Sequence, residues 1–231
     1  MIRLATANLY KGLPLERARA GVDTVLTHGV DIAALQEWVR GRDSILRDLR
    51  SRGLSYCRPA EGGGPIVYTD RFSALHCRAV TLARREFVGH LPGRKNRLPA
   101  SIANLTVLHD DQTGGELAVI NFHLTAEVQS GGKYRRDLAH RLRVQRHKRE
   151  RRRLSREVRR QQRRGREVFA LGDTNYHGMP LPPLRSCWRG REGGTLGHRA
   201  VDVVYAGTEA DVVRTVVTGS DHRAVVVAYK G

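Results

Sequence analysis

The chain has 231 residues, enough to bury a hydrophobic core, and its 41 Lys and Arg against 23 Asp and Glu give a net charge of +18. Its 40% of apolar residues excludes a wholly disordered chain, and no apolar run reaches the roughly 20 residues that span a bilayer. The first residues lack the apolar stretch of a signal peptide. We therefore expect a single domain over residues 1–231, monomeric, cytoplasmic and without membrane contact.

Short apolar strands alternate with amphipathic helices along the chain. Apolar residues at helical spacing predict helices over residues 14–28 and 43–52. Apolar runs and alternation predict strands over residues 2–7, 31–36, 65–68, 73–82, 100–108, 116–124, 168–172, 201–206, 212–217 and 223–229. This order predicts an α/β fold whose sheets contain mixed strands.

Most of the positive charge lies in one segment, residues 133–166. It contains 17 basic and 3 acidic residues, against 24 and 20 in the other 197. Arginine outnumbers lysine 36 to 5, which a GC-rich genome also produces, but codon bias does not explain the clustering. The segment is predicted to be a helix with a thin apolar face, so that it rests lightly on the body and exposes its charge. A polyanion, above all nucleic acid, is the expected partner.

The cysteines favour a reducing compartment. Cys57, Cys77 and Cys187 form no disulfide framework and show no metal-type pairing.

Polar residues of catalytic type stand at the ends of the apolar strands, again and again. They are Asn8, Glu37, His123, Asp173, Asn175, Asp202, Asp221 and His222. Strand ends converge at one edge of a sheet, which is where ligand sites of α/β proteins form. Asp202 lies inside an apolar strand, where a carboxylate is costly unless it is paired, and His222 is its natural partner.

The ordered set of motifs resembles the endonuclease/exonuclease/phosphatase superfamily, the deoxyribonuclease I-like fold. Each motif alone is weak, but six of them occur in the correct order at strand ends. They are Thr6-Ala7-Asn8, Gln36-Glu37, Asn121-Phe122-His123-Leu124, Gly172-Asp173-Thr174-Asn175, Val201-Asp202-Val203-Val204 and Ser220-Asp221-His222. The resemblance implies a four-layer α/β/β/α sandwich, with two packed mixed sheets flanked by helices.

The resemblance also implies a metal-dependent phosphodiesterase. Glu37 matches the principal ligand of Mg²⁺, with Mn²⁺ as the alternative ion, and Asn8 and Asp221 match residues close to the metal. Such an ion takes hard oxygen ligands and keeps several waters. Phosphodiester hydrolysis needs a Lewis acid, a placed water and donors around the developing negative charge.

The remaining matches concern the attacking water and the phosphate. Asp173 matches the residue that orients or deprotonates the water, and Asn175 a hydrogen-bond donor to the phosphoryl oxygens. His222, oriented by Asp202, would stabilise the charged transition state, and His123 would contact phosphate or protonate the leaving oxygen.

Two features depart from, or only partly match, the family pattern. Arg97 resembles a phosphate-binding arginine at a strand start, although a solvated arginine is an equal interpretation in so basic a chain. Thr174 stands where an aromatic residue is common.

Three functions remain open from the sequence. A nuclease acting on DNA would use the basic segment to hold the phosphate backbone, through Arg149, Arg152, Arg153, Arg156 and Arg160. A small-molecule or lipid phosphoesterase would use the same core residues. A non-catalytic nucleic-acid-binding protein is the third alternative, and the complete set of catalytic side chains disfavours it.

Overall fold

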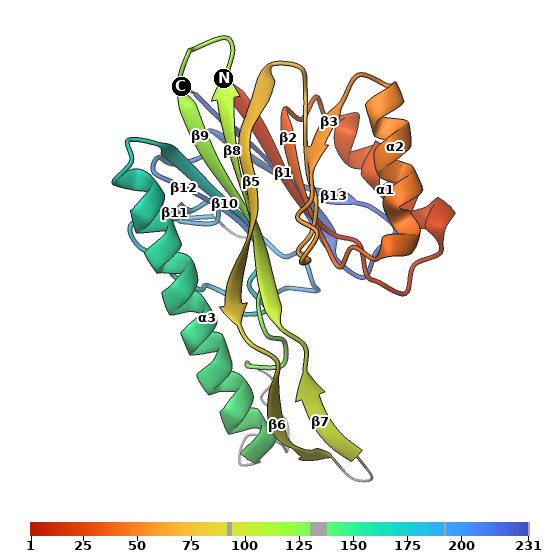
Figure 1. The fold of residues 1–231 in the computed structure, drawn as a ribbon, viewed down its shortest axis with the longest axis vertical. Helices are drawn as coiled ribbons and strands as arrows, with labels where there is room; N and C mark the ends of the chain where they lie inside the picture. The colour runs from red at the N-terminus through yellow and green to blue at the C-terminus, as the bar shows by residue number, and fades with distance from the viewer. Residues whose placement is uncertain (92–93, 130–137, 192, 231) are drawn as a thin grey trace.

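Two six-stranded β-sheets pack face to face in a computed structural model that describes residues 1–91, 94–129, 138–191 and 193–230 (Figure 1). The first sheet has the spatial order β13 (Val212–Val217), β14 (Arg223–Tyr229), β1 (Ile2–Asn8), β2 (Ile32–Gln36), β4 (Ile66–Tyr68) and β3 (Ser55–Cys57). The second has the order β11 (Arg185–Ser186), β12 (Asp202–Ala206), β10 (Glu167–Asp173), β9 (Glu116–His123), β8 (Ser101–Asp110) and β5 (Phe72–Ala83).

Helices cover the outer faces of both sheets. On the first sheet lie α1 (Leu15–Leu26) and α2 (Asp43–Ser51), the latter preceded by a short 3₁₀ helix, η1 (Arg40–Arg42). On the second sheet lies α3 (Leu138–Gln162) (Figure 1). The hairpin of β6 (Glu86–Leu91) and β7 (Arg94–Leu98) projects from the body beside the start of α3. The predicted four-layer α/β/β/α sandwich is confirmed.

The alternation of side chains along each strand divides the core in two. In β1, Ala5 and Ala7 face one way and pack with apolar residues of α1 and α2. Leu4 faces the other way and joins the larger cluster between the two sheets. The same cluster extends to the outer face of the second sheet, where it includes Leu154 and Val158 of α3, both fully buried. Both sheets are therefore buried on both faces, which explains their near-continuous apolar strands.

Strand direction places the polar strand ends at one edge. β1 runs parallel to β2, and Asn8 is level with Gln36. In the other sheet β9 runs parallel to β10, and His123 is level with Asp173. β12 is antiparallel to β10, so its first residue, Asp202, is also level with Asp173. Three of the predicted site residues thus form one row across three neighbouring strands.

Several predicted bounds need correction. The strand predicted at 73–82 covers Phe72–Ala83, and the one predicted at 100–108 covers Ser101–Asp110. The helix predicted over 133–166 is described as Leu138–Gln162, and residues 133–137 lie outside the described residues. The strands β3, β6, β7 and β11 were not predicted. These strands are short or polar. They form because they pair with a neighbouring strand, and no apolar run in the sequence marks them.

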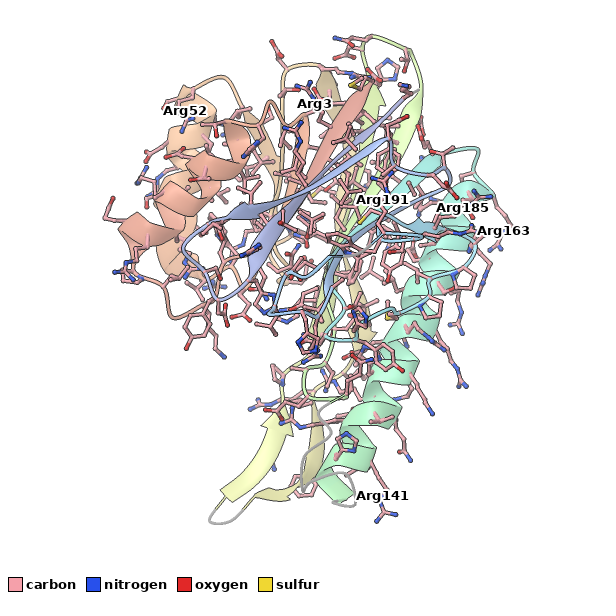
Figure 2. All side chains as sticks on the ribbon, turned by 180° about the vertical axis from the view of Figure 1, so that it is seen from behind. Arg3, Arg52, Arg141, Arg163, Arg185 and Arg191 are labelled. Carbon is pink, nitrogen blue, oxygen red and sulfur yellow. A yellow bond between two sulfur atoms is a disulfide. The ribbon has the colours of Figure 1, made fainter. Side chains whose placement is uncertain are left out.

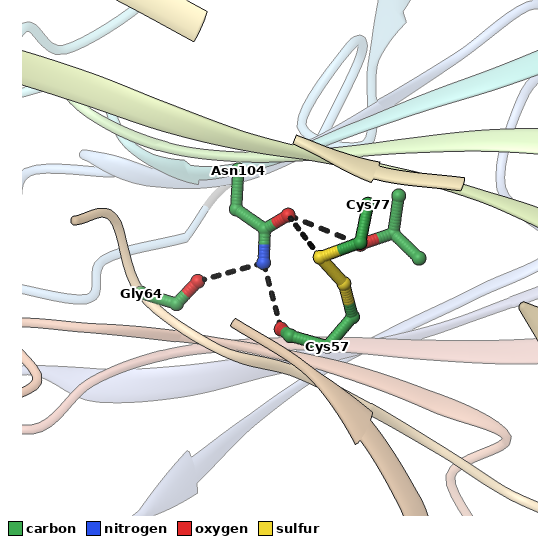
Figure 3. The surroundings of a disulfide bond; sticks show 5 residues. Cys57, Gly64, Cys77 and Asn104 are labelled. Carbon is green, nitrogen blue, oxygen red and sulfur yellow. Dashed lines mark hydrogen bonds between the residues drawn. A yellow bond between two sulfur atoms is a disulfide. The ribbon is translucent and has the colours of Figure 1, made fainter. Parts of the chain in front are cut away.

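The expectation of three unpaired cysteines was wrong for two of them. Cys57 of β3 and Cys77 of β5 form a disulfide, with their Cα atoms 6.2 Å apart (Figure 3). These are edge strands of different sheets, so the bond joins the two sheets along one side of the sandwich. Asn104 supports this junction, because its amide donates to the carbonyls of Cys57 and Gly64 at 2.8 and 3.1 Å. Cys187 is buried and free.

Among the described residues, no helix is long and apolar enough to cross a membrane.

Candidate functional site

The ends of β1 and β2 bring an amide and a carboxylate together at the edge of the first sheet. The Nδ2 of Asn8, the last residue of β1, lies 3.4 Å from Oε1 of Glu37, which follows β2 directly. Glu37 has φ of +54°, a left-handed conformation that is uncommon outside glycine, and its Oε2 accepts the backbone N–H of Lys11 at 2.8 Å. The backbone turn after β2 therefore fixes the direction of this carboxylate.

Asp173 connects the two sheets. Its Oδ2 accepts a hydrogen bond from Asn8 Nδ2 at 3.0 Å, across the interface between the sheets. The same oxygen lies 3.6 Å from Nε2 of His123 and 3.9 Å from Nδ1 of His222. Asp173 is 1% exposed, and its Oδ1 accepts the backbone N–H of Asn175 at 2.6 Å. One buried carboxylate thus contacts three other polar side chains of the predicted site.

His222 and Asp202 form a buried pair, as the sequence predicted. The Nδ1 of His222 lies 2.8 Å from Oδ2 of Asp202, whose side chain is fully buried. Because Nδ1 is used in this hydrogen bond, the other ring nitrogen, Nε2, remains available. Asp202 is held in turn by the loop before it, where the Oγ1 of Thr195 accepts its backbone N–H at 3.1 Å.

Asn175 has a constrained place beside this centre. Its φ is +49°, and its Nδ2 donates to the carbonyl of Leu124 at 3.0 Å. The loops that follow β9 and β10 are therefore tied to each other one residue beyond His123 and two beyond Asp173.

The other two predicted residues are exposed and have no hydrogen bond to this cluster among the described residues. Asp221 is exposed just before β14, and its Oδ1 accepts a hydrogen bond from Ser220 at 3.0 Å. Arg97 is exposed on β7, in the projecting hairpin, and does not line the groove described next.

A groove of about 580 Å³ opens beside the cluster and is lined by Glu37 and His123. Glu61 and the glycines that follow it form part of its wall, with Ser101 opposite and Arg143 and Arg146 of α3 also contributing. A small ester or one nucleotide of a longer strand fits a cavity of this size.

Burial and charge shift the acid–base properties of the centre. Burial raises the pKa of Asp173 above the ordinary range, and the nearby carboxylate of Asp202 acts in the same direction. Burial alone lowers the pKa of His222, but the hydrogen bond and the charge of Asp202 outweigh it and raise that pKa to about 9. At neutral pH the centre therefore combines an imidazolium with a carboxyl group that accepts a proton more readily than usual.

The residues fit a divalent cation. The Oδ1 of Asn8 is buried and has no hydrogen-bond partner among the described residues, and the Nδ2 of the same amide lies 3.4 Å from the carboxylate of Glu37. An amide oxygen and a carboxylate are ligands that Mg²⁺ prefers. A second candidate set consists of Asp173, Asp202 and His222, whose ligand atoms lie within 4.8 Å of one another. In that set, however, His222 Nδ1 and Asp202 Oδ2 already bond to each other.

Sequence reasoning missed the polar network under the site. Gln36 donates from Nε2 to Oδ1 of Asn121 at 2.7 Å, and Asn121 donates to the carbonyls of Leu35 and Pro65 at 2.9 and 3.0 Å. Both residues stood in the quoted motifs without a role. Their signal was present, because Asn121 shares a strand face with His123 and is polar inside an apolar strand.

The basic helix was also misjudged, because α3 does not rest lightly on the body. The side chains of Arg146 and Glu150 are 2% and 0% exposed, and Arg146 Nε lies 2.9 Å from Glu150 Oε1. Glu150 accepts the backbone N–H and the hydroxyl of Thr125 at 2.8 and 2.7 Å. Arg146 also donates to the carbonyls of Arg84 and Pro99.

One turn of α3 thus reaches the loops that follow β9 and β10. Arg146 and Glu150 hold Thr125, two residues after His123, and the Nε2 of His147 donates to the carbonyl of Thr174 at 2.8 Å. Burial lowers the pKa of His147, so its ring is neutral and acts here as a simple donor. The signal in the sequence was the acid at Glu150, four residues after Arg146 in an otherwise basic stretch.

Comparisons with known proteins agree with this architecture. No protein-family model and no curated protein sequence matches the chain. Among solved structures, an endonuclease/exonuclease/phosphatase of Bacteroides vulgatus superposes with a TM-score of 0.73 at 14% identity, over 98% of this chain and 97% of its own. A humanized TDP2 of D. rerio gives 0.76 at 13% identity, over 100% and 99%. The human Nocturnin catalytic domain, with bound sulfate, gives 0.71 at 17% identity, over 98% and 93%.

The chain therefore has the fold of the endonuclease/exonuclease/phosphatase superfamily, as its motifs predicted. The structures from Bacteroides vulgatus and D. rerio superpose on nearly the whole chain. The cluster around Asp173 lies where the polar strand ends of the two sheets meet.

Replacing Glu150 tests whether α3 stabilises the fold through its buried pair. We expect Glu150→Gln to lower the free energy of unfolding by about 3 kcal/mol, because it removes the buried charged partner of Arg146 and leaves only the partly exposed Glu86, 3.7 Å away. Urea unfolding followed by circular dichroism measures the change. Glu116→Gln is the matched control, since Glu116 pairs with Arg166 at the surface, and a change within about 0.5 kcal/mol is expected there. Equal effects of both substitutions would contradict a stabilising role for the buried pair of Arg146 and Glu150.

The raised pKa of His222 predicts a stability that depends on pH. Because protonation is favoured in the folded protein, the contribution is complete below pH 6.5 and is lost as the pH rises through about 9. In the presence of a chelator, the wild type should lose at most about 3 kcal/mol between these values, and His222→Gln should lose much less. Urea midpoints at pH 6.5 and 9.5 measure this, with the exposed His28→Gln as control. Parallel losses in wild type and His222→Gln would show the assignment to be wrong.

Proposed function

We infer that this protein is a metal-dependent phosphodiesterase that hydrolyses DNA phosphodiester bonds by attack of an activated water, acting as a monomer. The observation that carries this inference is the buried carboxylate of Asp173, which contacts Asn8, His123 and His222 within 4 Å. A carboxyl group of raised pKa beside an imidazolium and an amide is a suitable arrangement for moving a proton next to a phosphate.

The ion in this proposal is Mg²⁺, for which Mn²⁺ can substitute. Glu37 and Asn8 would hold it, and Asp221 would supply a further carboxylate oxygen from the loop before β14. When bound, the ion supplies Lewis-acid polarisation of a phosphoryl oxygen. The buried, unpartnered Oδ1 of Asn8 supports this assignment, because a buried acceptor without a donor is otherwise unfavourable.

The remaining side chains have roles in proton transfer and charge stabilisation. Asp173 orients the attacking water and accepts its proton. The imidazolium of His222, held by Asp202, stabilises the negative charge that develops on the phosphoryl oxygens. Asn175 retains one amide hydrogen beyond its bond to Leu124 for the same oxygens. His123, which borders the groove, protonates the leaving oxygen.

A phosphoesterase for small molecules is the second candidate. The groove of about 580 Å³ is large enough to enclose a small ester, and a mannosyl-6-phosphatase of Bacteroides thetaiotaomicron is among the structural neighbours. Another neighbour is a TDP2 of D. rerio in complex with a single-strand DNA product. A shared fold therefore accompanies both kinds of substrate, and the choice between them rests on features outside the centre.

The exposed face of α3 favours nucleic acid. Along it runs a basic stripe, defined as Arg141, Lys148, Arg152, Arg156, Arg159 and Arg163. These exposed side chains have no hydrogen bond or ion pair to other described residues. Arg141 and Arg163, at the two ends of the helix, point away from the sheets (Figure 2). Because a helix rises 1.5 Å per residue, the stripe is about 33 Å long, close to the length of one turn of B-DNA, about 34 Å.

The structure changes which arginines are available for DNA. Of the five expected from the sequence, Arg149 pairs with Glu86 at 2.7 Å, and Arg153 donates to the carbonyl of Leu82 at 3.2 Å. Arg160 lies 3.8 Å from Glu157. Only Arg152 and Arg156 remain without partners among the described residues, and both belong to the basic stripe.

Hydrolysis of supercoiled plasmid in the presence of Mg²⁺ tests the proposed activity. We expect nicking that a chelator abolishes and that Asp173→Asn slows by about 10²–10⁴-fold, because that substitution removes the proton acceptor. Glu37→Gln should raise the Mg²⁺ concentration needed for half-maximal rate. Glu61→Gln, which removes another carboxylate that lines the groove, is its matched control and should not.

A small chromogenic phosphodiester, assayed in parallel, separates the candidate functions. Intact plasmid with rapid hydrolysis of the small ester would overturn DNA as the substrate and favour the second candidate. No hydrolysis of either substrate, with DNA binding retained, would favour a non-catalytic nucleic-acid-binding protein.

The basic stripe predicts the salt dependence of DNA binding. Arg152→Gln, Arg156→Gln and Arg159→Gln together should reduce the slope of log affinity against log salt by about 2–3, since each phosphate contact contributes about 0.9. Fluorescence anisotropy with a duplex, in the Asp173→Asn background, measures the slope. Arg17→Gln, Arg47→Gln and Arg214→Gln remove the same charge from exposed sites on the first sheet and its helices. An equal reduction in both triple variants would mean that net charge, not the stripe, determines binding.

A further inference from the structure

Two adjoining cavities, with volumes of about 450 and 570 Å³, are lined by the residues that follow Asn175, and they share no lining residue with the groove beside Asp173. They share His177 and His198, so we treat them together as the histidine groove. Its residues used here are Tyr176, His177, His198, Arg199, His140 and Trp188. Among the described residues, no Asp or Glu lines either cavity, in contrast to the groove beside Asp173, which Glu37 and Glu61 line.

The position of His177 is fixed before any ligand binds. Its backbone N–H donates to Oε1 of Gln129 at 2.5 Å, and its carbonyl accepts from Nε2 of the same side chain at 3.1 Å. Its Nδ1 accepts the backbone N–H of Ala200 at 3.0 Å. The proton of the neutral ring is therefore on Nε2, which is left as a donor without a partner among the described residues.

His198 is presented at the tip of a tight turn. Leu196 and Arg199 exchange backbone hydrogen bonds at 3.1 Å, so that Gly197 and His198 are the two central residues, and Gly197 has φ of +59°.

The base of this turn is attached to the catalytic centre. The Oγ1 of Thr195 accepts the backbone N–H groups of Val201 and Asp202 at 3.2 and 3.1 Å. The carbonyl of Thr195 accepts the N–H of Arg223, the residue after His222, at 2.8 Å. The turn that carries His198 is therefore built onto the same backbone segments that hold the Asp202–His222 pair.

Several donors of the groove have no acceptor among the described residues. The Nε2 of His140 is buried without a partner, which is uncommon for a buried polar atom. The guanidinium of Arg199 has no carboxylate or carbonyl within bonding distance in the described part of the chain. Flat rings are also present, since Tyr176 is 38% exposed and Trp188 is partly buried.

The histidines do not form a metal site in this arrangement. The only three His, Cys, Asp or Glu side chains whose ligand atoms lie within 4.8 Å of one another, among the described residues, are Asp173, Asp202 and His222. Histidine and arginine donors that line one groove, with no carboxylate among its described residues, suit an anion instead.

We propose that the histidine groove binds a nucleotide of the substrate strand next to the scissile phosphodiester, through its phosphate and its base. This proposal rests on the proposed function. His177, His198 and Arg199 donate to the phosphate, and the base stacks on Tyr176 or Trp188. Tyr176 and His177 follow Asn175 directly, so their Cα atoms lie within about 8 Å of that residue's Cα. A strand whose scissile phosphate is at Asp173 therefore reaches the groove with its next nucleotides.

Binding in the absence of turnover tests this site separately from the activity. In the Asp173→Asn background, the pair His198→Asn and Arg199→Gln should weaken the affinity for a single-stranded dodecamer about tenfold. Both side chains lack partners in the described fold, and thermal melting checks that the variant is folded. His28→Asn with Arg17→Gln is the matched control, because both residues are exposed on or beside α1.

Competition with small ligands identifies what the groove recognises. Deoxyadenosine monophosphate should displace the dodecamer at a concentration at least fivefold lower than inorganic phosphate does, and this preference should disappear in Tyr176→Ala, Trp188→Ala or their combination. Unchanged affinity in the His198→Asn and Arg199→Gln variant would overturn the site. Equal competition by phosphate and by the nucleotide would overturn the assignment of a nucleotide. Neither the binding nor the competition measurement requires catalysis. A failure to cleave plasmid would therefore count against the proposed function without deciding whether the histidine groove binds a nucleotide.

Discussion

The buried carboxylate of Asp173 is the group on which the rest of the site depends. It ends β10 in the second sheet and accepts a hydrogen bond from Asn8, which ends β1 in the first. A carboxylate that is 1% exposed is unfavourable unless donors surround it, so the two sheets must meet with their polar strand ends aligned. The same contacts that satisfy this side chain bring the two histidines within 4 Å of it. The same packing of the two sheets therefore also brings the side chains of the site together.

The basic helix has two faces with different tasks. Arg146, His147 and Glu150 face inward and hold the loops after β9 and β10, through Thr125 and Thr174. The basic stripe faces solvent and has no apolar side chains. A helix that lies in a membrane interface would instead expose an apolar face. The charges of this helix that are buried and paired thus contribute to local stability, and in the proposed function its exposed charges attract the phosphate backbone of DNA.

Much of the fold could be predicted because its strands are buried on both faces. Continuous apolar runs such as β2 and β10 stand out, and the register of the row formed by His123, Asp173 and Asp202 follows once the strands pair. The strands β6 and β7 escaped prediction, because polar and charged residues interrupt both segments and leave no continuous apolar run. The Cys57–Cys77 disulfide escaped it for another reason, since it depends on two sheet edges meeting and not on the spacing of the cysteines.

The sequence by itself determined the chemistry that is available, because a polar residue at the end of an apolar strand is visible in the order of residues alone. It identified the members of the centre and the pair of Asp202 with His222. Only the tertiary structure decided which groups contact Asp173 and which are exposed without a hydrogen bond to it, as Asp221 and Arg97 are. It also separated paired from free arginines on α3, among the described residues, and assembled the histidine groove from segments that are distant in the sequence. The physical reason is that burial, pKa and partnership depend on neighbours across sheets and loops, which no local pattern of residues specifies.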